Sequence, residues 1–87
     1  MRLGFVLSRY EKLYEKLDNN KNDVLWAELD KLLRHHGFIL QANNSTHKVY
    51  VHELLIEQVT IVVKSNKVKL PIYVDKALKA INKVTLD

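Results

Sequence analysis

The chain has 87 residues, which allow one domain over residues 1–87 and leave no room for a second. Apolar residues make up 47% of it and charged residues 28%, with two glycines and one proline, so the composition excludes a disordered or fibrous protein. The formal charge of +4 is modest, and the lack of cysteine excludes disulfides, thiolate nucleophiles and cysteine-based zinc sites and favours a cytoplasmic protein.

The first predicted element is a helix over residues 5–17, where apolar side chains recur every three or four positions. Arg9 and Glu11 interrupt the apolar run near the N-terminus, so we expect neither a signal peptide nor a membrane span. The polar run of residues 18–22 is rich in turn-forming side chains, and it should end the helix.

A second helix is predicted next, with Asn22 or Asp23 accepting hydrogen bonds from the amides of its first turn. Gly37 supplies the left-handed residue that closes this helix. The buried face is expected to consist of Leu25, Trp26, Leu29, Leu32 and Leu33.

From residue 38 onward the periodicity changes to that of strands. Residues 38–41 form a short apolar run, and residues 42–46 form a polar loop. Residues 47–52 and 58–63 are rich in β-branched and aromatic side chains, and the short connection between them predicts an antiparallel hairpin. The middle of the chain should therefore contain three strands.

The last predicted element is a helix that begins at Pro71, after a basic loop over residues 64–69. Its apolar stripe consists of Val74, Ala77, Leu78, Ile81 and Val84. The order is therefore α-α-β-β-β-α, which indicates an α+β fold with a three-stranded antiparallel sheet and helices packed on one face. The other face of the sheet is left for water or a ligand.

The positive charge is concentrated near the C-terminus. Between Lys64 and Lys83 there are six lysines and one acid, Asp75, whereas the rest of the chain is close to neutral. A polyanion such as nucleic acid would be drawn to this segment, because lysines that neutralise phosphates release counterions. The alternative is a lysine face that only keeps the protein soluble.

Most enzyme signatures are missing from the sequence. With two glycines there is no glycine-rich phosphate loop, and no acidic cluster has the spacing of a calcium loop. His35 and His36, adjacent at the end of a predicted helix, are interpreted as partners of its dipole, and no pair of histidines has the i, i+4 spacing that favours zinc. We therefore expect no metal and no cofactor.

His47 is the best candidate for a catalytic residue. It stands where the polar loop enters a strand, a position that can hold a side chain rigidly and still expose it, although a plain surface histidine is the alternative. Alternation leaves two arrangements open. His47 lies on the open face if Tyr50 points to the core, and it turns inward at the strand edge if the valines of this strand form the core. A bulge near His52 would satisfy both.

Three segments of the sequence occur in a recognisable order. Residues 26–38 form a leucine-rich helix that ends in Gly-Phe, residues 44–50 place a histidine and a basic residue at the start of a strand, and residues 69–74 carry a Lys-x-Pro-x-Tyr sequence at the start of the last helix. In this order and spacing they resemble the HicA family of mRNA interferase toxins. The resemblance covers residues 22–84 and makes residues 1–21 an N-terminal helical extension.

The resemblance implies a fold like that of the double-stranded RNA-binding domain. The activity that it implies is cleavage of mRNA without the ribosome. The resemblance also implies a partner, a HicB-like antitoxin that covers the active face. The family's catalytic histidine falls on His47. Ser45 and Thr46 stand where the family has glycine and serine, so Ser45 would weaken the activity if the glycine lets the RNA backbone approach closely.

Imidazole exchanges protons near neutral pH and suits a metal-free ribonuclease, so His47 would deprotonate the 2′-hydroxyl or protonate the leaving oxygen. The residues expected to bind RNA are Ser45, Thr46, Lys48, Lys64, Lys67, Lys69 and Lys76. Tyr50 is expected in the core rather than stacked on a base. Two other hypotheses stay open: a non-catalytic RNA-binding module, and an inactive HicA-like relative that acts through protein interaction.

Overall fold

The computed structural model describes residues 8–85 of the chain. It shows an α+β fold, as predicted. In chain order the elements are α1 (Arg9–Asn19), α2 (Trp26–His35), β1 (Ile39–Asn43), β2 (His47–Val51), β3 (Val59–Lys64), β4 (Lys67–Val68) and α3 (Pro71–Thr85). None of the helices in this part of the chain has the length and apolar character that crossing a bilayer requires.

The sheet has four antiparallel strands in the order β1-β2-β3-β4, one more than predicted. The additional strand, β4, lies within residues 64–69, which the sequence pattern predicts as a basic loop. Ser65 and Asn66 both have positive φ, 52° and 67°, and they reverse the chain so that Lys67 pairs with Lys64. Such a two-residue turn usually contains glycine, and without glycine it left no clear signal in the sequence.

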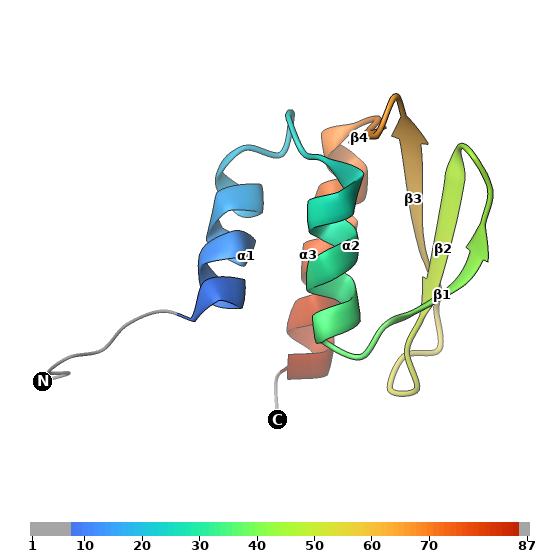
Figure 1. Cartoon of the computed structure of the whole chain (residues 1–87). Helices are drawn as coiled ribbons and strands as arrows, with labels where there is room; N and C mark the ends of the chain where they lie inside the picture. The colour runs from blue at the N-terminus through green and yellow to red at the C-terminus, as the bar shows by residue number, and fades with distance from the viewer. Residues whose placement is uncertain (1–7, 86–87) are drawn as a thin grey trace, which may run out of the picture.

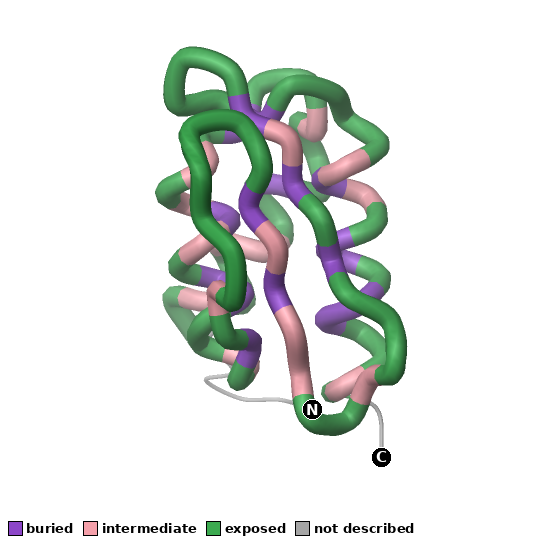
Figure 2. Tube along the Cα trace, turned by 90° about the vertical axis from the view of Figure 1, so that its right-hand side faces the viewer, coloured by how far each residue is buried: buried purple, intermediate pink, exposed green. Residues whose placement is uncertain are grey.

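Helices α2 and α3 cover one face of the sheet, as predicted, and α1 packs on the side of these helices that is turned away from the sheet (Figure 1). Along β2 and β3, buried residues alternate with exposed or half-buried ones (Figure 2). The core between the helices and the sheet includes Leu29, Leu33, Tyr50, Ile61, Val63, Val74, Leu78 and Ile81. No described helix covers the opposite face of the sheet.

Helix α1 is capped by Ser8. The Ser8 hydroxyl accepts a hydrogen bond from the Glu11 amide at 3.1 Å, and the Glu11 carboxylate accepts one from the Ser8 amide at 2.8 Å. The helix ends at Asn19, in the polar run where its end is predicted, and it buries Leu17. Its predicted beginning, residues 5–7, lies outside the described residues.

Neither of the two side chains predicted to cap α2 does so. Leu25 occupies the N-cap position without a side-chain hydrogen bond, and it is 45% exposed rather than buried. The Asn66 carbonyl, in the turn between β3 and β4, accepts a hydrogen bond from the Trp26 amide at 2.9 Å instead. Asp23 forms an ion pair with Lys67 at 2.7 Å. The start of α2 is therefore tied to β4 by tertiary contacts, which a local sequence pattern does not contain.

The end of α2 follows the prediction. Gly37 has a φ of +90°, a region that glycine enters at little cost, and a Cβ there would lie 3.1 Å from Nε2 of His52. The His52 ring donates from Nε2 to the His36 carbonyl at 2.9 Å, because its Nδ1 accepts from the Leu54 amide at 3.0 Å. Both ring nitrogens of His52 are therefore engaged by backbone groups.

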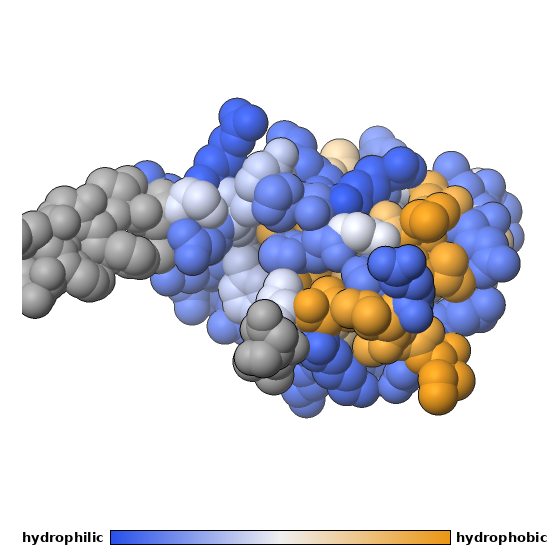
Figure 3. Space-filling model, turned by 90° about the horizontal axis from the view of Figure 1, so that it is seen from below, coloured by the Kyte–Doolittle hydropathy of each residue, from blue (hydrophilic) through white to orange (hydrophobic). Residues whose placement is uncertain are grey.

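The loop between β2 and β3 carries apolar side chains at the surface. Leu54 is 67% exposed and Ile56 is fully exposed. Seen from below, the molecule gathers apolar surface on the side of the sheet (Figure 3). Contiguous exposed apolar surface commonly marks a site of contact with another molecule.

Candidate active site

The alternation along β2 decides which face of the sheet His47 occupies. Lys48 and Tyr50 are buried against the helices, whereas the valines of this strand are half-buried on the other face. His47 shares the face of the valines and is exposed, so the first of the two predicted arrangements holds. The bulge lies at Gln41 of β1 and not near His52.

The turn before β2 holds His47 by its backbone. The side-chain oxygen of Asn44 accepts hydrogen bonds from the amides of Thr46 at 3.0 Å and His47 at 2.7 Å. The backbone amide of Asn44 donates a hydrogen bond to the His47 carbonyl at 3.1 Å. This side-chain turn closes the hairpin of β1 and β2 without glycine. The position of His47 therefore depends on a short polar side chain three residues before it.

A neighbouring hydroxyl orients the imidazole of His47. Thr46 Oγ1 lies 2.8 Å from Nδ1, and a hydroxyl can donate to a ring nitrogen or accept from it. When Nδ1 carries the hydrogen, it donates to Thr46 Oγ1. The Thr46 hydroxyl can then donate a weak hydrogen bond to Asn44 Oδ1, which lies 3.4 Å away. Thr46 thus supports both neutral tautomers. No other described residue bonds to the ring, which leaves Nε2 open to a ligand.

His47 lines an open hollow where the ends of β2, β3 and β4 meet. The Val63 amide donates to the Thr46 carbonyl and the Lys69 amide donates to the Val62 carbonyl, both at 2.8 Å, so these strand ends are fixed to one another. The hollow has a volume of about 470 Å³ and is lined by Ser45, Thr46, His47, Val62, Val63, Lys64, Ser65 and Lys69.

The charge in this hollow has one sign. Its lining contains Lys64 and Lys69 and no acidic residue. Neither lysine forms an ion pair with a described residue, in contrast to several lysines elsewhere on the surface. An anion placed beside the His47 imidazole would therefore meet positive charge that no carboxylate has neutralised.

Lys48, which was predicted to bind RNA, is turned inward. It is 7% exposed, and its Nζ donates to Oδ1 of Asn43 and to the carbonyl of Asn44, each at 2.6 Å. The same ammonium lies 4.4 Å from the centroid of the Trp26 ring. Lys48 therefore braces the turn that carries His47 and presents no charge to a ligand in the hollow.

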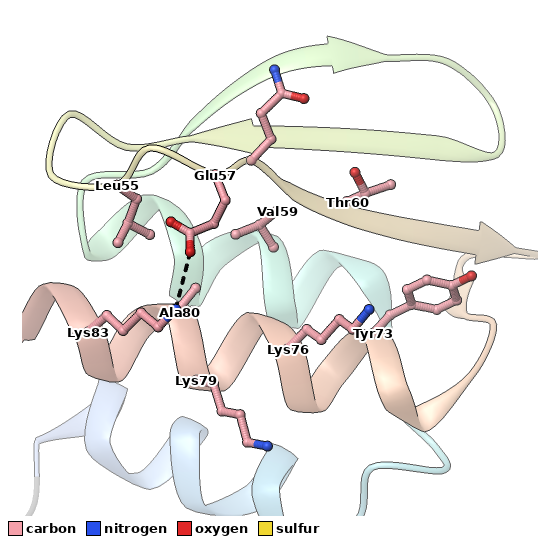
Figure 4. A pocket seen from close by; sticks show the side chains of 10 residues that line it. Leu55, Glu57, Val59, Thr60, Tyr73, Lys76, Lys79, Ala80 and Lys83 are labelled. Carbon is pink, nitrogen blue, oxygen red and sulfur yellow. Dashed lines mark hydrogen bonds and ion pairs between the residues drawn. The ribbon is translucent and has the colours of Figure 1, made fainter.

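Two further predicted lysines lie away from the hollow. The Nζ of Lys67 lies 2.7 Å from the Asp23 carboxylate, in the connection between α1 and α2. Lys76 lies on α3 and lines a separate groove between that helix and β3 (Figure 4). The structure thus brings together Ser45, Thr46, His47, Lys64 and Lys69, and it separates Lys48, Lys67 and Lys76 from them.

Behind the turn, a chain of polar contacts links β2 to α2. The Tyr50 hydroxyl donates to the Asp30 carboxylate and accepts from the indole N–H of Trp26 at 3.0 Å. Arg34 Nε donates to both oxygens of Asp30 at 3.0 Å. Burial, and then the hydrogen bond to Asp30, raises the pKa of Tyr50 well above its ordinary value. Tyr50 is in the core as predicted, whereas Trp26 is only half-buried.

Asn44 was not predicted as a residue of the site, although the sequence contains a signal for its role. An asparagine shortly before a strand is typical of a side-chain turn, and the run Asn43-Asn44 has that position. Val62 and Ser65 also line the hollow, and no local signal identifies them, because their place depends on how β3 pairs with β2 and β4.

Within residues 8–85, no three His, Cys, Asp or Glu side chains converge to hold a metal ion. In comparisons with known proteins, no family model, no curated protein and no solved structure matches the chain. The likeness to the HicA family therefore depends on the three segments at residues 26–38, 44–50 and 69–74.

Proposed function

We propose that this chain is the toxin of a type II toxin–antitoxin pair, a metal-independent endoribonuclease that cleaves mRNA with His47. The main support is an exposed imidazole with one open nitrogen, in the same hollow as Lys64 and Lys69, which pair with no described acid. Such a hollow suits the phosphate backbone of a nucleic acid. The resemblance to HicA toxins favours RNA as that nucleic acid.

In the proposed reaction, Nε2 of His47 takes the proton of a 2′-hydroxyl group. The 2′-oxygen then forms a bond to the adjacent phosphorus and the bond from phosphorus to the 5′-oxygen breaks, which leaves a 2′,3′-cyclic phosphate. The leaving oxygen takes a proton from water or from the imidazolium. Lys64 and Lys69 stabilise the negative charge that the phosphate gains in the transition state, and Thr46 keeps the ring in place.

A single imidazole contributes about 10²- to 10⁴-fold to such a reaction, which suffices for a toxin that needs few cuts per message. The proposal includes a cytoplasmic location, an RNA-binding core like that of the double-stranded RNA-binding domain, and a HicB-like antitoxin that covers the hollow. The open lining of the hollow supports the last point, because a partner can reach His47 without moving any element.

The test is RNA cleavage by His47→Ala. The parent protein should cut a long transcript without ribosomes in the presence of EDTA, and His47→Ala should lose about 10² or more of that rate while its fold is retained. His35→Ala is the matched control, since His35 is exposed at the end of α2, and it should cleave like the parent. Equal cleavage by folded His47→Ala would contradict the assignment.

The second candidate is a non-catalytic RNA-binding module, and Ser45 favours it. Ser45 lines the hollow where the HicA family has glycine, so its side chain narrows the approach of an RNA backbone to His47. This candidate predicts salt-dependent RNA binding without cleavage. If Ser45 alone obstructs the site, Ser45→Gly should cleave RNA. If the site has no cleavage activity of its own, Ser45→Gly should bind RNA and still not cleave it.

A further inference from the structure

The outer edge of β3 is only partly covered by β4. On one side β3 pairs with β2 from Val59 to Val62, but on the other side β4 pairs only with Val63 and Lys64. The Val62 carbonyl points away from β2, because it accepts from the Lys69 amide. Residues two apart in a strand point their backbone groups to the same side, so the N–H and C=O of Thr60 also point outward. No described residue bonds to them.

A groove of about 380 Å³ lies between this edge and α3 (Figure 4). It is lined by Leu55, Glu57, Gln58, Val59, Thr60, Tyr73, Lys76, Lys79, Ala80 and Lys83. The apolar side chains among these form a floor, and Glu57, Lys76 and Lys83 stand along the rim. An exposed strand edge beside an apolar groove is the arrangement by which several domains bind an extended peptide as an added strand.

The charges on the rim favour an acidic segment. Figure 4 shows Lys83 meeting Glu57 and Lys76 running along α3 toward Tyr73, both on the side of the groove, whereas Lys79 points away from the strands and pairs with Asp75 at 3.0 Å. Lys83 pairs with Glu57 at 3.2 Å, and Lys76 forms no ion pair with a described residue. A carboxylate entering the groove would therefore find one unpaired ammonium and a second that it can share with Glu57.

We infer that the outer edge of β3 and the adjoining groove bind an extended acidic segment of a protein partner as an added strand. From Tyr73 to Lys83 the helix is about 15 Å long, which matches four or five residues of extended chain at about 3.3 Å each. Alternate side chains of that segment would lie on the apolar floor, and the exposed Leu54 and Ile56 extend the contact beyond the groove. This inference does not depend on RNA cleavage.

A peptide rather than RNA is inferred because of the backbone groups at the edge. The N–H and C=O of Thr60 are matched by the C=O and N–H of another strand, whereas a phosphate offers only acceptors. The floor formed by Leu55, Val59 and Ala80 suits apolar side chains in the same way. RNA binding in the groove is therefore an outcome that would overturn the proposal.

The probe is a peptide of roughly seven residues that alternates Asp or Glu with Val or Ile, added to the isotope-labelled full chain. In amide NMR spectra we expect shifts at residues 58–62 and 73–83, and none at 45–47. A peptide N-methylated at alternate amides should bind at least about tenfold more weakly, because it cannot donate to the edge. Equal binding of the methylated peptide, or shifts confined to the hollow around His47, would overturn the inference.

Three variants test the charges without touching the fold. Lys76→Glu should weaken the peptide by about tenfold, and Glu57→Gln should tighten it severalfold by removing a competing carboxylate. Lys79→Gln, on the same helix but turned away, should change little. The proposal fails if all three behave alike, or if a short oligouridylate shifts the groove amides and the peptide does not.

Discussion

The two ends of β3 lie beside surfaces of different chemistry. At its C-terminal end lies the hollow of His47, where Lys64 and Lys69 have no acidic neighbour in the lining. At its N-terminal end lies the groove beside α3, where an apolar floor is bordered by lysines of which one is already paired with Glu57. The first suits a bare polyanion and the second an acidic peptide with apolar side chains.

The number of lysines in a segment does not predict which surface each of them lies on. Residues 64–83 contain six lysines and one acid, and the fold distributes them over three surfaces. Two lie in the hollow, one bonds to the connection between α1 and α2, and the rest belong to α3. The positive charge that these lysines share in the sequence is therefore divided between surfaces of different chemistry.

Among the variants that compare the two ends of β3, Asn44→Ala should have the largest effect, because it should impair the hollow and leave the groove intact. The substitution removes the acceptor for two backbone amides, so the position of His47 is no longer fixed, and RNA cleavage should fall by about 10- to 100-fold. Peptide binding in the groove should not change. Asn22→Ala, in the connection before α2, is the control and should cleave normally. Unchanged cleavage by Asn44→Ala would show that the turn does not position the histidine.

A crossed experiment on lysines separates the two ends directly. Lys64→Gln with Lys69→Gln should weaken RNA binding by about tenfold and lower its salt slope by about 1.4, or about 0.7 for each lost phosphate contact to a single strand. Lys76→Gln with Lys83→Gln should leave that slope unchanged and weaken the peptide instead. Equal losses of RNA affinity in both pairs would mean that the two surfaces act as one.

Gly37→Ala should destabilise the whole protein without distinguishing the two ends. The positive φ at Gly37 and the 3.1 Å approach of a Cβ to His52 should together cost about 1–2 kcal/mol in the free energy of unfolding, measured with urea. Cleavage per folded molecule should stay the same. Ala27→Gly, at an exposed position of α2, tests helix propensity alone, with an expected loss of about 1 kcal/mol.

The smallest effect is a pH dependence that arises from Tyr50. Because the pKa of Tyr50 is raised in the fold, the unfolded chain loses the phenolic proton at lower pH than the folded one. The stabilisation is therefore complete below the ordinary pKa of about 10 and decreases as the pH rises above it. Urea titrations from pH 8 upward should show this decrease, and it should be smaller in Tyr50→Phe. The same slope in both proteins would assign it to other groups.

The sequence predicted the helices and the location of the core well, because these follow from periodicity. The apolar stripe of α3, its start at Pro71 and the closure of α2 at Gly37 all depend on neighbours within one or two turns. The fourth strand was missed because the turn before it, Ser65-Asn66, contains no glycine. The start of α2 was predicted wrongly because it depends on the contact between Asn66 and Trp26, which are far apart in sequence.

The candidate site was predictable in part for a related reason. The position of His47 at the entrance of a strand was visible in the sequence, and so was the pair of alternatives for its orientation. The burial of Tyr50 decides between them, and in the structure the Tyr50 hydroxyl is bonded to Trp26 and Asp30 of α2. Lys48 follows Tyr50 inward because residues two apart share a face, so its inward position was implied once Tyr50 was assigned to the core.

The contact between the β3–β4 turn and the start of α2 also limits where the chain can accept inserted residues. The turn carries Lys64 and Lys69 on its two sides, and it is held by hydrogen bonds from the Trp26 amide to Asn66 and from the Val68 amide to Val24. An extra residue among 20–25 would displace this anchor and move the two lysines relative to His47. The length of that connection, more than 20 positions from the histidine in sequence, therefore bears on the geometry of the hollow.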